Sequence, residues 1–256
     1  MVKPKKSLGQ HFLRDENIAH RIADTLNEYR HLPLLEVGPG TGALTRFLLE
    51  TGYDLKVVEI DLESAAYLER HFPALQGRIL VEDFLQMDLH NLFQGNPFCL
   101  TGNYPYCISS QIFFKLLEHK NHIPCCTGMI QKETALRLAA SHGGRIYGIT
   151  SVLIQTWYDV EYLFTVDENV FSPPPKVKSA VVRLTRNRRT ALPCDETLFR
   201  QLVKTAFNQR RKILRNSLRP FFDRTPRPAL LESPLLNLRP EQLPFEAFID
   251  LTLLLT

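Results

Sequence analysis

Short apolar runs alternate with amphipathic stretches through the first half of the chain. The runs at 32–37 (LPLLEV) and 55–60 (LKVVEI) have the length and composition of buried strands. Further strand-like runs lie at 78–81, 98–101 and 125–130, and helical periodicity occupies 43–50, 62–70, 110–117 and 133–140. Strands that alternate with helices at this spacing predict crossover units and a mainly parallel, doubly wound α/β sheet.

The pattern changes in the second half of the chain. Residues 151–166 are rich in β-branched and aromatic side chains, and 177–184 (VKSAVVRL) has strand character. Because only a proline-rich loop separates these two segments, we expect them to pair antiparallel at one edge of the sheet. Beyond them the pattern is helical and is divided by prolines into short pieces. We therefore predict an α/β domain over 1–187 and a small all-helical domain over 188–256.

Composition fits an ordinary globular protein and adds one asymmetry. The chain has 256 residues, of which 44% are hydrophobic and 23% charged, so a disordered, collagen-like or coiled-coil chain is excluded. The net charge of +4 divides unevenly, since 18 basic and 20 acidic residues up to residue 185 give −2, while 13 basic and 7 acidic residues beyond it give +6. A short basic helical domain indicates a polyanionic partner.

The cysteines and the N-terminus exclude further classes. The five cysteines are odd in number and form no CxxC pair, so we expect reduced thiols, no disulfide framework and no metal site. The basic N-terminus lacks the apolar stretch of a signal peptide, and no run approaches the roughly 18 apolar residues of a membrane span. We expect a soluble cytoplasmic protein that does not engage a membrane.

The strongest local signal is EVGPGTGA at 36–43, directly after the first predicted strand. A glycine-rich turn between a strand and a helix brings backbone N–H groups close to a ligand without a Cβ in the way. Gly38, Gly40 and Ala43 also satisfy the dinucleotide fingerprint G-x-G-x-x-A. The turn therefore predicts a nucleotide site and leaves the nucleotide open.

Two carboxylates extend this site. Glu59 ends the second strand, where it can accept hydrogen bonds from both hydroxyls of a ribose. Asp83 follows the third strand and can accept a hydrogen bond from an adenine amine, with Phe84 against the ring. Asp61 is interpreted as the N-cap of the helix that starts at Leu62. These residues outline an adenosine pocket that fits either NAD or S-adenosylmethionine.

The tetrapeptide Asn103-Tyr104-Pro105-Tyr106 after the fourth strand separates the two cofactors. An adenine amine is a poor nucleophile because its lone pair is delocalised into the ring. Acceptors for its two hydrogens, here the Asn103 side-chain oxygen and the Tyr104 carbonyl, favour an amine whose lone pair faces a methyl donor. Pro105 restricts Tyr104 to extended backbone, and Tyr106 can stack on the base. A sulfonium donor is already activated, so positioning and electrostatics suffice without a strong general base.

Six motifs follow one another in a fixed order: GQHFL (9–13), EVGPGTG (36–42), VVEID (57–61), NYPY (103–106), FSPPPKVKSAVVRL (171–184) and AFNQRRKILRNSL (206–218). This set resembles the small-subunit ribosomal RNA adenine dimethyltransferases, the KsgA family, from about residue 5 to 218 and more weakly to the end. The resemblance implies a Rossmann-like, S-adenosylmethionine-dependent methyltransferase domain with a helical domain after it. It also implies transfer of two methyl groups to each of two adjacent adenosines in a hairpin near the 3′ end of small-subunit (16S) rRNA.

The resemblance further implies the residues that hold the cofactor, namely His11, Leu13, Gly38, Gly40, Glu59, Asp83 and Asn103. Three positions depart from the usual pattern of the family, which has Asn at position 11, an aliphatic residue at 104 and Asn at 107. His11 can still donate or accept a hydrogen bond. Tyr104 need only supply its backbone, and Cys107 is interpreted as a packing residue.

The proline-rich segment 171–176 (FSPPPK) cannot be helix interior or central strand. A polyproline ligand for a partner domain is one interpretation, but the segment runs straight into strand character, which favours a stiff internal loop. We expect this loop to hold Phe171 against one face of an extruded adenine, with Tyr106 on the other face. Asn103, Tyr106 and Phe171 are therefore the predicted catalytic residues.

The helical region carries seven basic residues and no acidic one between 199 and 219. Uncompensated positive charge on one segment indicates a surface that follows phosphates. The predicted RNA-binding residues are Arg210, Arg211, Lys212 and Arg215. The partner is then small-subunit rRNA in the pre-30S particle, bound by a monomer.

Three other functions stay open on the sequence alone. A DNA or large-subunit RNA adenine methyltransferase uses similar tetrapeptides, although the two long motifs favour the small-subunit enzyme. A ribosome-assembly factor would depend on binding more than on chemistry. A nicotinamide oxidoreductase explains the glycine turn but not residues 103–106.

Overall fold

The computed structural model describes residues 2–222 and 231–255, and the chain forms two compact units. Unit 1 comprises Met1–Ala135 and Asp159–Arg186, and unit 2 comprises Leu136–Tyr158 and Asn187–Thr256. The segment 136–158, which the sequence pattern assigned to the α/β domain, thus groups with the C-terminal helices. Over the described residues, no helix has the length and apolarity needed to cross a bilayer.

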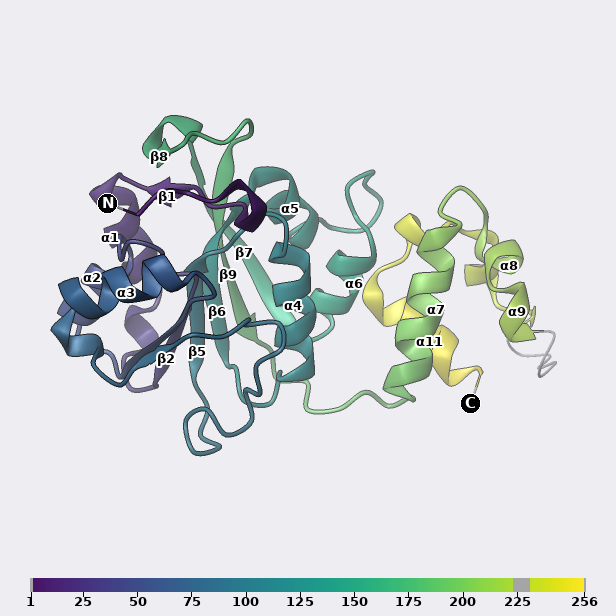
Figure 1. The fold of residues 1–256 in the computed structure, drawn as a ribbon. Helices are drawn as coiled ribbons and strands as arrows, with labels where there is room; N and C mark the ends of the chain where they lie inside the picture. The colour runs from purple at the N-terminus through teal and green to yellow at the C-terminus, as the bar shows by residue number, and fades with distance from the viewer. Residues whose placement is uncertain (1, 223–230, 256) are drawn as a thin grey trace. The chain divides into compact units, whose positions relative to one another are not determined.

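Unit 1 is built on a seven-stranded sheet in the order β4-β3-β2-β5-β6-β9-β7 (Figure 1). Its strands are β2 (Leu34–Val37), β3 (Leu55–Val58), β4 (Ile79–Leu80), β5 (Cys99–Asn103), β6 (Cys125–Gln131), β7 (Tyr158–Val166) and β9 (Ser179–Arg186). From β4 to β6 all neighbours pair in parallel, and β9 runs antiparallel to β6. The predicted doubly wound sheet and its first five strands are confirmed.

Helices lie on both sides of this sheet (Figure 1). They are α1 (Glu16–Asp24), α2 (Thr45–Glu50), α3 (Leu62–His71), α4 (Ser109–Glu118) and α5 (Lys132–Leu138). Apolar side chains of α1, α2 and α3 share one core with the strands, in which Ile22, Leu48 and Leu68 have no exposed surface. Burial of this face fixes the strands in register and so aligns their carboxyl ends at one edge.

The prediction for residues 151–166 is only half right. Residues Ile149–Gln155 form helix α6, and the strand β7 begins at Tyr158. The Gly148 N–H donates to Ser151 Oγ at 3.0 Å at the start of this helix, and the following apolar side chains are buried. This tertiary burial outweighs the β-propensity of the sequence ITSVLIQ. The strand β7 does lie beside β9 at the sheet edge, as predicted.

A second, two-stranded sheet joins the N-terminal segment to the proline-rich segment. Strand β1 (Phe12–Leu13) pairs antiparallel with β8 (Phe171–Ser172), with Leu13 opposite Phe171. The Arg14 N–H also donates to Val170 O at 2.8 Å. Two motifs that are about 160 residues apart in the chain are thereby fixed side by side.

Unit 2 is helical, apart from connecting segments. Among its described residues, the elements after α6 are α7 (Glu196–Asn208), α8 (Leu214–Ser217), α9 (Arg219–Phe222), α11 (Phe245–Leu253) and the 3₁₀ turns η5 (Pro234–Asn237) and η6 (Pro240–Gln242). Asp195 caps α7 by accepting from Leu198 N at 2.6 Å. Phe207 of α7 lies between Tyr147 and Phe248, with ring centroids 6.0 and 5.8 Å away. An aromatic core therefore connects α7, α11 and the segment before α6.

Two facing glycines in the sheet make room for the buried ring of Tyr104. Gly102 of β5 pairs with Gly128 of β6, and a Cβ at Gly128 would lie 2.5 Å from Tyr104 Cε2 and 2.6 Å from Gly102 O. The ring is 1% exposed, and its hydroxyl donates to Thr127 O at 3.0 Å. Tyr104, at a position where the family that the sequence resembles has an aliphatic residue, is thus fully packed.

We predict that Gly128→Ala destabilises the fold by about 1–3 kcal/mol, because the added methyl overlaps both a ring and a backbone carbonyl. Thermal unfolding measures the effect. Adding Tyr104→Leu should restore only part of the loss, since Gly102 O stays in place. Gly144→Ala is the matched control, because its Cβ would find its nearest neighbour 3.7 Å away. An unchanged melting temperature in Gly128→Ala would contradict this packing.

Candidate active site

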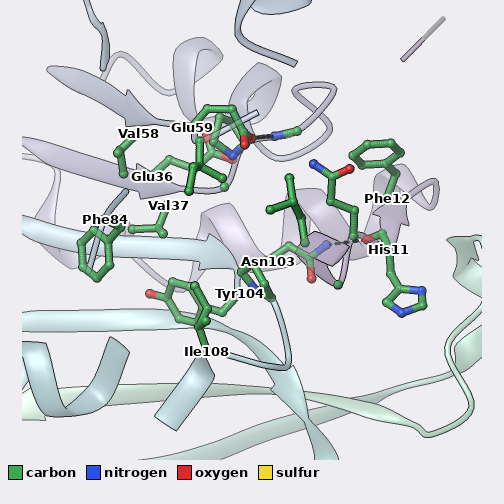
Figure 2. Close-up of a pocket in the computed structure, with 18 of the residues that line it drawn as sticks. His11, Phe12, Glu36, Val37, Val58, Glu59, Phe84, Asn103, Tyr104 and Ile108 are labelled. Carbon is green, nitrogen blue, oxygen red and sulfur yellow. Dashed lines mark hydrogen bonds between the residues drawn. The ribbon is translucent and has the colours of Figure 1, made fainter. Parts of the chain in front are cut away.

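The carboxyl ends of β2, β3 and β5 and the segment after β4 open into one pocket (Figure 2). The predicted cofactor residues line it: His11, Leu13, Gly38, Gly40, Glu59, Asp83 and Asn103. Tyr104 and Tyr106 line it as well. The structure thus brings together residues from four strand ends and from the N-terminal segment.

The glycine turn forms one wall of this pocket. Gly38 and Gly40 have φ angles of +68° and +58°, which favour glycine. A Cβ at Gly40 would lie 2.9 Å from Phe12 Cε1, so the turn needs glycine also because the N-terminal segment approaches it closely. The Gly40 N–H donates to Glu59 Oε2 at 3.0 Å.

Glu59 is 4% exposed, and backbone N–H groups hold both of its oxygens. Besides the bond from Gly40, Asp61 N donates to Glu59 Oε1 at 2.9 Å. Figure 2 shows Glu59 among the residues that line the pocket. Burial raises the pKa of Glu59, and these N–H donors oppose the rise. Each carboxylate oxygen can accept a further bond, so the side chain is fixed and keeps capacity for ligand hydroxyls.

Asp61 caps α3 as predicted and also anchors the N-terminal segment. Its Oδ1 accepts from Glu63 N at 3.2 Å and from Lys5 Nζ at 2.5 Å, and its Oδ2 accepts from Gln10 Nε2 at 3.2 Å. Burial acts to raise the pKa of Asp61, but the hydrogen bonds, chiefly from Lys5, hold it below the ordinary value. Residues 5–13 are therefore fastened across the pocket at Asp61 and at β8.

Asn103 bonds to the same segment. Its Nδ2 donates to His11 O at 2.9 Å (Figure 2). Because a carbonyl oxygen only accepts, this bond assigns the amide orientation and leaves Oδ1 as the acceptor on the other side. A side chain in this position can accept one hydrogen of an amine, as the sequence predicts.

His11 enters the site with its backbone rather than with its ring. The ring points away from Glu36 and Glu59 (Figure 2) and stacks on Tyr106, with centroids 5.5 Å apart and planes at 25°. Its Nδ1 lies 2.7 Å from Pro173 O, so Nδ1 carries the hydrogen of that bond. The side chain thus contacts the predicted base-stacking residue, and a cofactor contact through it stays a prediction.

Tyr106 and Phe171 are not brought together. Tyr106 lines the pocket, and its hydroxyl lies 2.5 Å from Ser179 Oγ. Phe171 is 3% exposed and belongs to the hydrophobic core of unit 1, opposite Leu13 in the strand pair. The predicted aromatic sandwich is therefore absent from this conformation, because the pairing of β8 with β1 turns Phe171 into the core.

Asp83 occupies the predicted place after β4. Its Oδ1 accepts from Leu85 N at 2.9 Å, which fixes a turn whose carbonyls at Leu85 and Met87 accept from Lys115 Nζ at 3.0 and 2.5 Å. Burial lowers the pKa of Lys115. An ammonium from α4 thus holds the segment that presents Asp83 and Phe84 to the pocket.

The four predicted RNA-binding residues lie in unit 2, and three of them have hydrogen-bond partners there. Arg210 donates to Gly144 O at 3.1 Å, Lys212 to Gln209 Oε1 at 2.9 Å and Arg215 to Leu231 O at 3.1 Å. Arg211 is exposed.

In the described residues no cluster of His, Cys, Asp and Glu side chains forms that could hold a metal ion.

Glu36 is a pocket residue that the sequence reasoning did not single out. It is 1% exposed, and Thr45 Oγ1 donates to its Oε2 at 2.7 Å. Burial raises its pKa to about 8, the Thr45 bond opposes the rise and the nearby Glu59 adds to it. The available signal was a charged residue within an otherwise apolar buried strand.

We predict that Glu36→Gln removes a pH dependence of stability. The pKa of this carboxyl rises on folding from 4.5 to about 8. Below pH 4.5 both the folded and the unfolded state hold the proton, so the free energy of unfolding does not change with pH. Between the two pKa values only the folded state holds it, so the free energy of unfolding falls as the pH rises. Without cofactor, the melting temperature of the wild type should therefore fall relative to that of Glu36→Gln from about pH 5 to about pH 8. Gln can still accept the Thr45 bond, so the variant should fold. Parallel melting curves over this range would contradict a buried, protonated Glu36.

Comparison with known proteins agrees with this geometry. The family described as ribosomal RNA adenine dimethylase matches residues 1–246. "Ribosomal RNA small subunit methyltransferase A" of Parabacteroides distasonis is 62% identical over 255 residues, covering 99% of this chain and 94% of that protein. The protein of the same name from Porphyromonas gingivalis is 58% identical, covering 99% and 98%.

Two solved structures share the fold over almost the whole chain. A dimethyladenosine transferase from Plasmodium falciparum has a TM-score of 0.77 at 23% identity, covering 95% of this chain and 96% of that one. The 23S rRNA methyltransferase ErmE has a TM-score of 0.68 at 28% identity, covering 94% and 99%. The chain belongs to the ribosomal RNA adenine dimethylase family, and it is a methyltransferase that uses S-adenosylmethionine.

Proposed function

We propose that this protein dimethylates two adjacent adenosines at their exocyclic amines in the 3′-terminal hairpin of small-subunit rRNA. It does so as a cytoplasmic monomer acting on the pre-30S particle during small-subunit assembly. The observation that carries the proposal is the Asn103 amide, held by His11 O, at the pocket that also contains Glu59. Relatives at 58–62% identity over nearly the whole chain carry the name of a small-subunit methyltransferase.

The pocket fits S-adenosylmethionine. Gly38 and Gly40, which have no side chains, line it, and Glu59 offers fixed carboxylate oxygens to ribose hydroxyls. In this proposal Asp83, which follows β4, accepts a hydrogen bond from the adenine amine, and residues His11 to Leu13 line the pocket from the N-terminal side. When bound, this cofactor supplies a methyl group that its sulfonium already activates.

The protein's own residues then position the target amine. Asn103 Oδ1 and the Tyr104 carbonyl accept its two hydrogens, which directs the nitrogen lone pair toward the methyl group. Burial raises the pKa of Tyr106, so its hydroxyl stays protonated and takes no part as a base. The proton that the nitrogen loses goes to solvent, because the reaction needs orientation more than a strong base.

The target base stacks on Tyr106 in this proposal. His11 already stacks there, which indicates that the Tyr106 ring offers a face to a planar group. A stacking role for Phe171 stays a prediction and requires its ring to leave the core of unit 1. Tyr106 and Asn103 are therefore the residues to which we assign the target adenine first.

A large-subunit RNA substrate is the second candidate, because ErmE acts on 23S rRNA and shares the fold at 28% identity. The higher identity to the small-subunit enzymes, over 99% of the chain against 94% for ErmE, favours the first. The decisive experiment offers labelled S-adenosylmethionine with under-methylated small subunits or with protein-free large-subunit rRNA. We expect two dimethyladenosines per small subunit by mass spectrometry of nuclease digests. Labelled adenine only in large-subunit rRNA would overturn the proposal.

We predict that Tyr106→Ala slows methyl transfer by about 5-fold to about 150-fold, the range that corresponds to loss of one stacked base. Tyr106→Phe keeps the ring and loses only the contact with Ser179, so its rate should stay near that of the wild type. Single-turnover rates at saturating cofactor provide the measurement, and calorimetric affinity for S-adenosylmethionine is the control. If the two variants were equally slow, the hydroxyl rather than the stacking surface would be the essential group.

A further inference from the structure

The exposed segment 141–146 (SHGGRI) is held by Arg210 of the basic motif and by η6, both in unit 2. Gly143 N donates to Glu241 O at 2.6 Å, and Arg210 Nη2 donates to Gly144 O at 3.1 Å. Arg210 Nε also lies 3.7 Å from Glu241 Oε2. The turn itself uses glycine at Gly143, whose φ is +89°. Arg210 therefore joins this segment and η6 to the end of α7.

These contacts occupy the guanidinium of Arg210. Its side chain is 33% exposed and that of Glu241 is 20% exposed, so the pair is partly withdrawn from solvent. A phosphate that captured Arg210 would leave Glu241 without its cation and Gly144 O without its donor. Loss of these two partly buried interactions is more unfavourable than one exposed contact with a phosphate is favourable. Arg210 is therefore a positioning residue and not a phosphate ligand.

The neighbours of these tied residues are exposed cations. Arg145 follows Gly144, Arg211 follows Arg210, and both side chains are exposed. Lys212 is also exposed, and its Nζ donates to a neutral group, Gln209 Oε1, at 2.9 Å. Within residues 2–222 and 231–255, no carboxylate forms an ion pair with any of these three.

We infer that Arg145, Arg211 and Lys212 form one RNA-phosphate-binding surface of unit 2, assembled by Arg210. Arg145 lies in the segment before α6, far in sequence from the basic motif, and the bond from Arg210 to the neighbouring Gly144 O joins the two. The two glycines also let the backbone approach a phosphate without a Cβ. The inference rests on the proposed RNA-binding role of unit 2 and adds to it a contact outside residues 206–218.

The test measures binding of the full-length protein to under-methylated small subunits as a function of salt. Each lost phosphate contact lowers the magnitude of the slope of log K against log salt by about 0.7 to 0.9. Arg145→Glu and Arg211→Glu should each bind more weakly and show this smaller slope. Arg145→Lys keeps the positive charge, so its slope should equal that of the wild type. Arg210→Met should keep the wild-type slope, while amide exchange of residues 142–146 becomes faster.

Arg30→Glu is the matched control, because it makes the same charge change at an exposed residue that precedes the opposite, amino-terminal end of β2. This inference would be overturned if Arg145→Glu had the same salt slope as Arg30→Glu while the slope of Arg211→Glu was smaller. The proposed function would not be affected by that result. A reduced slope for Arg210→Met would overturn its positioning role. Loss of binding on removal of ribosomal proteins rather than on digestion of rRNA would identify an acidic protein as the partner and overturn the phosphate assignment. A wild type that neither binds nor methylates small subunits would instead refute the proposed function.

Discussion

One hydrogen bond, from Asn103 Nδ2 to His11 O at 2.9 Å, connects the two halves of the active site. It joins the end of β5, which would present the target amine, to the N-terminal segment, which closes over the cofactor side of the pocket. The same bond uses the donor of the amide and so leaves its acceptor oxygen for the substrate that we propose. The ties from Lys5 and Gln10 to Asp61 and the pairing of β1 with β8 hold His11 where this bond can form.

The other end of the bond is fixed by packing inside the sheet. Gly102 and Gly128 admit the Tyr104 ring between neighbouring strands, and the hydroxyl of that ring bonds to Thr127 O. With its side chain buried and its N–H bonded to Met129 O at 3.0 Å, Tyr104 has little freedom to move. In the proposed mechanism its carbonyl is therefore fixed before the substrate binds, which lowers the cost of ordering the site. Stability of the sheet and geometry of the active site therefore depend on the same residues.

Local patterns predicted much of this molecule. The glycine turn, the five parallel strands and the Asp61 cap depend on residues close in sequence, and all are present. Features that depend on distant contacts were not accessible in this way. Helix α6 forms in a β-branched sequence because unit 2 buries it, Phe171 enters the core because β8 pairs with β1, and the ring of His11 reaches Tyr106 because Pro173 O binds it. The burial of Glu36, which raises its pKa to about 8, likewise arises only when α2 covers the strand.

The most direct measurement is made on Asn103→Asp, which keeps the size of the side chain and its acceptor oxygens but cannot donate to His11 O near neutral pH. If that bond orients the site, single-turnover methylation of small subunits should slow by at least about tenfold, the effect of one unsatisfied polar pair. Affinity for S-adenosylmethionine should weaken as the N-terminal segment loosens, while the melting temperature stays close to that of the wild type. An Asn103→Asp protein with wild-type cofactor affinity and wild-type methylation rate would contradict the role of this bond.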